Sequence, residues 1–362
     1  TIVCRQEGGV AYMADADGKM TGRPGIAFVT RGPGATNASG GVHVAFQDST
    51  PMILFIGDVA RGDTDREGFQ EVDFPAFFGP IAKWAARIDD ARRIPEYVAR
   101  AWRVATAGRP GPVALDRPAV APVAEAPDPG AIQALFELLK DAAAPVAIVG
   151  GADWSPRAGH HFANFAFRHG IPVAAAFRRQ DAVDNRCGVY AGQLGYGPNP
   201  RLQQRIRDAD LILAVGARLG ESTTDGYTLV TPDHPDQILV HVHPDPNELD
   251  RVYRADLPIC SDMGEFAEMI DDWHDPDCVR FAAGEEAHRE WLDWSEPKPR
   301  DGVTLDLGPC VAAMRDALGP SAIICNGAGN FSGWWHRYWR YGPQPSQLAP
   351  TSGTMGYGLP AA

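Results

Sequence analysis

Short apolar segments alternate with longer amphipathic segments along most of the 362-residue chain. The apolar segments predict buried strands at residues 26–30, 51–56, 112–115, 145–149, 172–176, 211–215, 238–243 and 322–325. Amphipathic or small-residue segments predict helices at 35–46, 91–106 and 131–139, and another from residue 305. Strands that alternate with helices indicate parallel sheets with helices on both faces. The predicted fold class is therefore α/β, with doubly wound parallel sheets.

The start of the chain predicts a junction between a strand and a helix. Ile2 and Val3 are interpreted as the end of a buried strand, and the apolar spacing from Val10 to Ala14 suits a helix. Glu7 would then lie at the junction, where a partly desolvated carboxyl group acquires a raised pKa and can transfer protons. The simpler alternative is a glutamate that is favoured in the first turn by the helix dipole.

Two changes in composition divide the chain. Residues 118–130 are rich in proline and alanine, and residues 282–301 are charged and contain prolines, so both are predicted to be linkers. The predicted domains are residues 1–117, 131–281 and 302–362. A chain of this length exceeds what one hydrophobic core usually supports, which agrees with several domains.

Charge and cysteine spacing exclude several classes of protein. A net charge of −13 argues against nucleic-acid binding. No apolar run approaches a membrane span and no signal peptide opens the chain, so a cytoplasmic protein without membrane contact is predicted. The six cysteines show neither CxxC nor zinc-ligand spacing and are predicted to be reduced thiols: Cys4, Cys187, Cys260, Cys278, Cys310 and Cys325.

Four motifs occur in a fixed order. They are RQEGG at residues 5–9, GPGATN at 32–37, FQEVD at 69–73 and GTMGYGLPAA at 353–362. Together they resemble the acetolactate synthase, pyruvate oxidase and benzoylformate decarboxylase group of thiamine-diphosphate enzymes, over nearly the whole chain. The resemblance implies three doubly wound domains, of which the first is N-terminally truncated and the third is mostly missing. It also places the family's magnesium motif beyond Ala362, so the chain is expected to be an internal piece that is inactive by itself.

The resemblance assigns roles to residues around the coenzyme. Glu7 would hold a ring nitrogen of the aminopyrimidine, although Gln6 and Gly8 stand where the family often has other residues. The carbonyl group of Gly353 and the amide of Met355 would contact the same ring, with the Met355 side chain between the two rings of the coenzyme. The alternative for this triplet is a glycine-rich turn with a core methionine.

The GPGATN loop has two interpretations. The resemblance places Gly32, Pro33 and Asn37 in the wall of the cofactor site and in a contact between two subunits. From the residues alone, Thr36 or Asn37 is a helix cap.

Three residues match positions at the substrate entrance of acetolactate synthases. The resemblance implies that Phe69 lines the entrance, that Gln70 bonds the acceptor keto acid as a catalytic residue, and that Lys83 attracts its carboxylate. The alternative is a solvated loop and a surface lysine.

The middle of the chain resembles the segments that hold FAD in the acetolactate synthase branch. Residues 216–220 (GARLG) would meet the pyrophosphate through Arg218, but His243 stands where an acidic residue is usual, which puts FAD in doubt. The pairs His160/His161 and His241/His243 lack a third ligand with metal spacing and are predicted to be solvated or core histidines.

The resemblance predicts a thiamine-diphosphate- and Mg²⁺-dependent carboligase. It would decarboxylate a 2-keto acid and transfer the remaining fragment to a second carbonyl, as a homodimer or homotetramer with a shared active site. Two alternatives stay open: another thiamine-diphosphate decarboxylase or lyase acting on a 2-keto acid or an acyl-CoA, and a non-catalytic flavin- or nucleotide-binding relative.

Overall fold

The computed structural model forms two compact units. It describes residues 1–59, 69–88, 90–114, 125–151, 154–232, 236–273, 281–298, 302, 305–343 and 345–362. Unit 1 comprises Thr1–Val123, Cys325–Ala328 and Leu348–Ala362, and unit 2 comprises Ala124–Ile324 and Gly329–Gln347. Among the described residues, no helix is long and apolar enough to cross a membrane.

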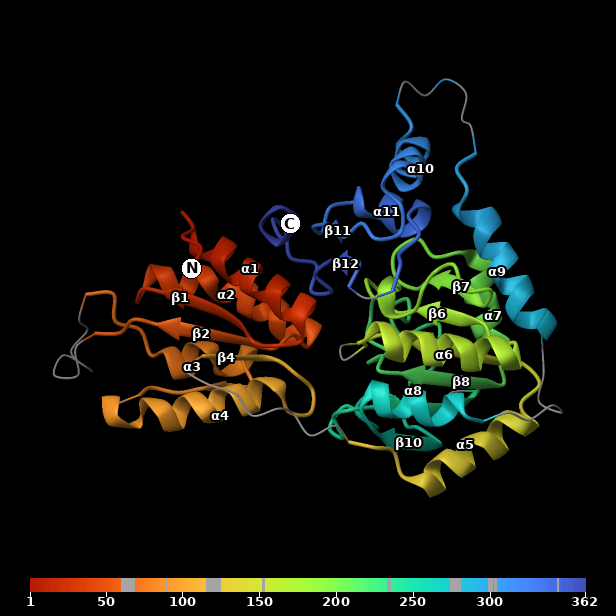
Figure 1. Ribbon diagram of the computed structural model, residues 1–362, viewed down its shortest axis with the longest axis horizontal. Helices are drawn as coiled ribbons and strands as arrows, with labels where there is room; N and C mark the ends of the chain where they lie inside the picture. Colours follow the sequence, from red (N-terminus) through yellow and green to blue (C-terminus); the bar gives the residue numbers. More distant parts are fainter. Residues whose placement is uncertain are drawn as a thin grey trace. The chain divides into compact units, whose positions relative to one another are not determined.

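Unit 1 is built on a four-stranded sheet whose paired strands are all parallel (Figure 1). In sheet order the strands are β1 (Gly25–Val29), β2 (Met52–Ile56), β4 (Pro112–Ala114) and β3 (Trp84–Ala85). This arrangement confirms the predicted strands at 26–30, 51–56 and 112–115 to within a residue or two.

Helices cover both faces of this sheet. Helices α1 (Glu7–Thr21) and α2 (Pro33–Asp48) share one apolar cluster with β1 and β2, whereas α4 (Ile94–Thr106) packs with Ile53 and Val113. Helices α1 and α2 approach each other closely at Gly41. A Cβ atom at this position would lie only 2.3 Å from the Cβ atom of Ala11. Among the described residues of unit 1, the other helical segments are α3 (Phe74–Phe78), η2 (Gly79–Ile81), η3 (Ala91–Arg93) and α12 (Gly358–Ala361).

Unit 2 contains a six-stranded sheet, again with parallel pairs throughout (Figure 1). Its strands, in sheet order, are β10 (Leu257–Cys260), β9 (Ile238–His243), β8 (Leu211–Val215), β5 (Pro145–Val149), β6 (Val173–Ala175) and β7 (Tyr190–Gln193). This is the order of a dinucleotide-binding sheet, and the order reverses between β5 and β8.

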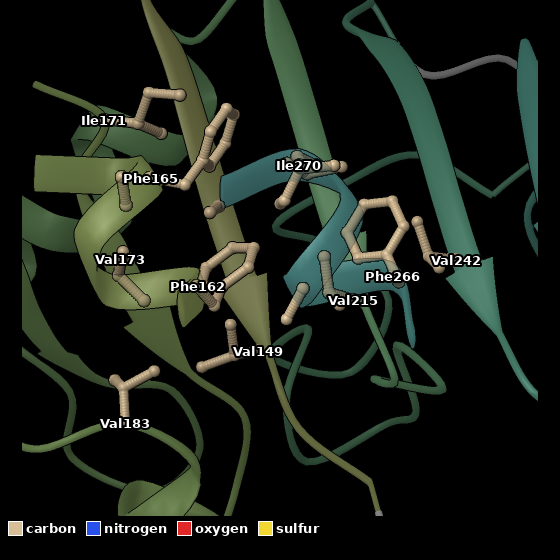
Figure 2. Packing of buried hydrophobic residues seen from close by; sticks show 14 of the residues in the cluster. Val149, Phe162, Phe165, Ile171, Val173, Val183, Val215, Val242, Phe266 and Ile270 are labelled. Atoms are coloured by element: carbon tan, nitrogen blue, oxygen red, sulfur yellow. The ribbon is translucent and has the colours of Figure 1, made fainter. Parts of the chain in front are cut away.

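The core of unit 2 lies on both faces of this sheet. Figure 2 shows Phe162 and Phe165 of one helix and Phe266 of another packed over strand residues such as Val149 and Val215. The opposite face holds a second cluster around Ile148, Ile212 and Leu202. The helical segments of this unit are α5 (Pro129–Asp141), α6 (Pro156–His169), η4 (Gln180–Ala182), α7 (Pro200–Arg207), α8 (Met263–Asp271), α9 (Phe281–Ser295), α10 (Leu307–Leu318) and α11 (Ser332–Tyr338).

Two sequence predictions of local structure are wrong. Ile2 and Val3 belong to no strand and are 74% and 91% exposed, because nothing in the described chain pairs with them. The predicted linker 282–301 contains most of helix α9, whose Ala287 and Trp291 are buried.

Strand β11 (Ile324–Cys325) and its partner β12 (Gln347–Leu348) occupy part of the predicted third domain. The three-domain boundaries stay a prediction.

Candidate active site

Glu7 begins helix α1 and lies beside the first turns of helix α2. Gln6 caps α1, because its side-chain oxygen accepts a hydrogen bond from the amide of Gly9. The side chain of Asn37 donates from Nδ2 to Glu7 Oε2 at 3.2 Å. Asn37 therefore fixes the Glu7 carboxyl group. The helix cap predicted at Thr36 or Asn37 is wrong, because both residues lie inside α2, whose N-cap is Gly32 without a side-chain bond.

Gly34 keeps space open beside the other carboxyl oxygen of Glu7. A Cβ atom at this position would lie 3.6 Å from Glu7 Oε1 and 2.7 Å from Thr30 Cγ2. Glycine at this place avoids a clash with Thr30 and puts no side chain against Oε1. Glu7 is half-buried, so part of the residue stays exposed.

The loop after β1 contacts the segment that carries Phe69 and Gln70. Gly32 has a φ of +57°, and a Cβ atom on it would lie 2.6 Å from Gln70 Cβ. Arg31 Nε donates to the carbonyl oxygen of Phe69 at 3.2 Å. Two of the predicted motifs are therefore brought together, with the Phe69 side chain 79% exposed.

The C-terminal motif forms an open turn. Gly353 and Gly356 have φ values of +69° and +79°, a region that glycine adopts without strain. Met355 between them is 81% exposed, so it is not a core methionine. Pro33 is also exposed, at the first position of α2.

Lys83 is directed toward a turn of unit 1. Its ammonium group donates to the carbonyl oxygens of Ala107 and Arg109, both at 2.6 Å. These bonds stabilise the turn after α4, and the substrate role of Lys83 stays a prediction.

Sequence reasoning missed a buried polar cluster in unit 1. Lys19 Nζ lies 2.8 Å from Asp15 Oδ2 and 2.5 Å from Asp48 Oδ2, and all three side chains are at most 7% exposed. Tyr357 donates its hydroxyl hydrogen to Asp15 Oδ2 at 2.8 Å. In sequence, Asp15 and Lys19 are spaced like an exposed ion pair on a helix, so their burial could not be expected.

In unit 2, glycines line the point where the strand order reverses. Gly151 follows β5 and Gly216 follows β8, both with positive φ, and a Cβ atom on Gly151 would lie 2.0 Å from the carbonyl oxygen of Gly216. Open α/β sheets bind nucleotides at this place. Arg218 is half-buried two residues beyond Gly216.

His241 and His243 end strand β9 as buried side chains. His241 Nε2 is 2.8 Å from the carbonyl oxygen of Ala217, and the amide of Asp245 donates to His243 Nδ1 at 3.1 Å. Burial lowers the pKa of His243 to about 4, so its ring is neutral at pH 7. Among the described residues, no group of three or more His, Cys, Asp or Glu side chains could hold a metal ion.

Acid is expected to destabilise unit 2 through its buried neutral histidines. Burial lowers the pKa of His336 to about 3 and the pKa of His243 to about 4. The ordinary pKa of histidine is about 6.5. As the pH falls, both histidines become protonated in the unfolded chain before they do so in the folded protein. The free energy of unfolding therefore falls as the pH falls from about 6.5 toward 4. Near pH 5 each histidine should account for a loss of about 2 kcal/mol.

Urea unfolding near pH 7 and near pH 5 measures this effect. The variant His243→Gln should lose less stability between the two pH values than the unchanged protein. Equal losses would contradict the assignment to His243.

Comparison with known proteins identifies the family. Residues 1–77 match the family described as "Thiamine pyrophosphate enzyme, N-terminal TPP binding domain", and residues 132–270 match "Thiamine pyrophosphate enzyme, central domain". The chain belongs to the thiamine pyrophosphate enzymes. Thiamine pyrophosphate is another name for thiamine diphosphate, so the family predicted from the sequence is confirmed.

Among curated thiamine pyrophosphate enzymes, the chain is similar to acetolactate synthases. It is 31% identical to the large subunit from Parasynechococcus marenigrum, over 100% of this chain and 62% of the relative. It is 27% identical to the large subunit from Corynebacterium glutamicum, over 100% of this chain and 61% of the relative. The enzyme from Bacillus subtilis is 26% identical over 100% of this chain and 66% of its own length. The chain thus spans about three fifths to two thirds of the length of these relatives.

The residues of unit 1 fit the pyrimidine end of the coenzyme. The resemblance implies a carboxyl group at the pyrimidine ring, and Glu7 supplies one whose Oε1 lies beside Gly34, which has no side chain. The match to the N-terminal domain includes Glu7, Asn37 and Gln70. The individual roles of these residues stay predictions.

Proposed function

We propose that this protein is a thiamine-diphosphate- and Mg²⁺-dependent 2-keto acid carboligase of the acetolactate synthase type. It would decarboxylate one 2-keto acid and join the remaining fragment to a second carbonyl compound. The observation that carries the proposal is the half-buried Glu7 carboxyl group, which Asn37 holds at Oε2 and which has Gly34, without a side chain, beside Oε1. We further propose a cytoplasmic homodimer or homotetramer.

Glu7 would share a proton with the pyrimidine ring. Because Oε2 accepts from Asn37, Oε1 would be the atom that shares a proton with a ring nitrogen of the ligand. When bound, thiamine diphosphate would supply a nucleophilic carbon for addition to the keto group. In the shared active site, the Gly353 carbonyl group and the Met355 amide of a second copy of the chain would orient the same ring, and the exposed Met355 side chain is available to pack against the coenzyme.

Gln70 and Phe69 would meet the acceptor. Gln70 has a φ of +63°, a strained conformation for a non-glycine residue, and it packs against Gly32. Arg31 holds the backbone of Phe69, so the aromatic side chain is presented outward. The side-chain amide of Gln70 would bond the keto acid, and the ring of Phe69 would form an apolar wall beside it. This combination suits a small 2-keto acid.

FAD is not part of this proposal. The glycines after β5 and β8 would admit a nucleotide, but the end of β9 holds the buried, neutral ring of His243 where the resemblance expects a carboxylate. Arg218 stays a predicted contact for a pyrophosphate.

The test uses protein expressed from its complete reading frame. With pyruvate, thiamine diphosphate and Mg²⁺ present, acetolactate should form, and omitting either cofactor should abolish it. Coenzyme binding without acetolactate would move the function to another thiamine-diphosphate decarboxylase or lyase, which other 2-keto acids and acyl-CoA substrates would identify. Absence of coenzyme binding would contradict the proposal.

A further inference from the structure

The acceptor of the proposed reaction carries a carboxylate, which needs a cationic partner when it leaves water. In a 2-keto acid the carboxylate is bonded directly to the reacting carbonyl carbon, so its partner must lie beside the acceptor residues Phe69 and Gln70. The resemblance assigns this task to Lys83, whose ammonium group already donates to two carbonyl oxygens, both at 2.6 Å. Arg31 is a second cation, and it contacts Phe69 directly.

Arg31 lies at the carboxyl end of strand β1, in the loop that leads into helix α2. Its Nε donates to the carbonyl oxygen of Phe69 at 3.2 Å. The neighbouring Gly32 has a φ of +57°, and a Cβ atom on it would lie 2.6 Å from Gln70 Cβ. Ligands of open α/β sheets bind at the carboxyl ends of strands. Arg31 therefore lies against the segment that would receive the acceptor, at the edge of the sheet where a ligand is expected.

The same loop also reaches the carboxyl group of Glu7. A Cβ atom on Gly34 would lie 2.7 Å from Thr30 Cγ2 and 3.6 Å from Glu7 Oε1, so Thr30 and Glu7 flank the same glycine. Arg31 follows Thr30 directly and is the only cation in the sequence of this loop. The loop thus touches Glu7 on one side and the Phe69–Gln70 segment on the other, and it carries a positive charge between them.

The guanidinium group of Arg31 has donors that the described contacts do not use. An arginine has five N–H donors, and in the described part of the chain only Nε of Arg31 has a hydrogen-bond partner. Arg93 pairs with Glu96, for example, whereas no carboxylate of the described residues forms an ion pair with Arg31. Arg31 is half-buried, so its charge is only partly solvated. Its terminal nitrogens Nη1 and Nη2 can therefore meet a carboxylate end-on, with two parallel hydrogen bonds.

We propose that Arg31 is a specificity-determining residue, which binds the carboxylate of the acceptor 2-keto acid through Nη1 and Nη2. This inference rests on the proposed function and names the residue that would select a charged acceptor. The side-chain amide of Gln70 would bond the keto oxygen, and the ring of Phe69 would face the alkyl group. A neutral aldehyde presents a carbonyl group without a carboxylate, so its addition would not need Arg31.

The first test compares two acceptors that differ only by a carboxylate, 2-ketobutyrate and propanal, with pyruvate as the donor. Protein from the complete reading frame is loaded with thiamine diphosphate and Mg²⁺, and the two cross-products are quantified in one mixture by chromatography. Arg31→Gln should lower the ratio of the carboxylated to the uncharged product by about 10- to 100-fold, the effect of losing a hydrogen bond to a charged group. Arg31→Lys keeps the charge without the planar fork, so it should lower the ratio less.

Arg23→Gln is the matched control, because Arg23 is an exposed arginine shortly before the same strand. A strand rises about 3.3 Å per residue, so Arg23 and Arg31 lie at opposite ends of β1. The control should keep the product ratio and the rates of formation of both products.

A second measurement does not depend on turnover. Phenylglyoxal modifies accessible guanidinium groups, and mass spectrometry gives the rate of modification at each arginine separately. Oxamate, an unreactive carboxylate analogue of pyruvate, should slow the modification of Arg31 in the coenzyme-loaded protein, whereas the neutral oxamide should not. The rate at Arg23 should not change with either compound.

Three results would each overturn the inference while the proposed function stands. An unchanged product ratio in Arg31→Gln, or an equal loss of both products, would leave Arg31 only as the anchor of the Phe69 backbone. Modification of Arg31 at the same rate with and without oxamate would do the same, and this result decides the question even if the variants do not fold. If the unchanged protein binds no thiamine diphosphate or forms neither product, the proposed function itself fails.

Discussion

Replacing Glu7 with glutamine is expected to lower acetolactate formation by about 10²- to 10⁴-fold, the usual contribution of a general acid or base. Glutamine has nearly the same shape and can still accept the bond from Asn37 at its side-chain oxygen. It would then present an NH₂ group at the place of Oε1, which cannot hold or share an acidic proton. The change therefore removes proton transfer while the fold is kept.

The measurement is turnover of pyruvate by protein from the complete reading frame, with the Kd for thiamine diphosphate measured beside it. Asp17→Asn is the matched control, since it removes an exposed carboxylate from the same helix. The control should retain full turnover. Equal turnover in Glu7→Gln and the control would rule out the proton-transfer role of Glu7.

Replacing Phe162 with alanine is expected to destabilise the protein by about 3–5 kcal/mol, the typical cost of deleting a buried aromatic ring. Phe162 is fully buried over the sheet of unit 2, among the side chains shown in Figure 2. Its ring packs edge-on against Trp154, with 5.8 Å between centroids. Truncation leaves a cavity that neighbours on a rigid sheet fill only in part.

Urea unfolding followed by tryptophan fluorescence measures this loss, because Trp154 is itself buried. Phe167→Ala is the control on the same helix, since Phe167 is 48% exposed and its removal should cost less than about 1 kcal/mol. Similar losses in both variants would show that the core of unit 2 tolerates large voids.

Strands β5, β6, β8 and β9 were predictable because each is a short apolar run whose residues are almost all buried. The strand predicted at 145–149 coincides with β5, and those at 211–215 and 238–243 coincide with β8 and β9. Their order in the sheet was not predictable, because sequence periodicity carries no information about which strands pair. Helix α9 was missed because charged residues surround its few apolar ones, and only the packed structure shows that Trp291 is buried.

The candidate site was predictable where its chemistry follows a contiguous motif. Glu7 and the loop at Gly32 could be named from the sequence, and the structure brings Asn37 and Gln70 next to them. The buried cluster could not be named, because Lys19 and Tyr357 are 338 positions apart. A basic residue four positions after an acidic one predicts an exposed pair, and only tertiary contact buries it.

Because helix α1 joins Glu7 to the Asp15–Lys19 pair, the number of residues between them sets the angle between these side chains around the helix axis. A helix turns by about 100° per residue, so a single residue inserted between Gly9 and Ala14 would rotate one end against the other by that angle. The carboxyl group and the buried pair could then not both keep their present partners, even with every original side chain retained. Recombination of this protein with relatives should therefore place crossovers outside Glu7–Lys19, so that this stretch is inherited as one block.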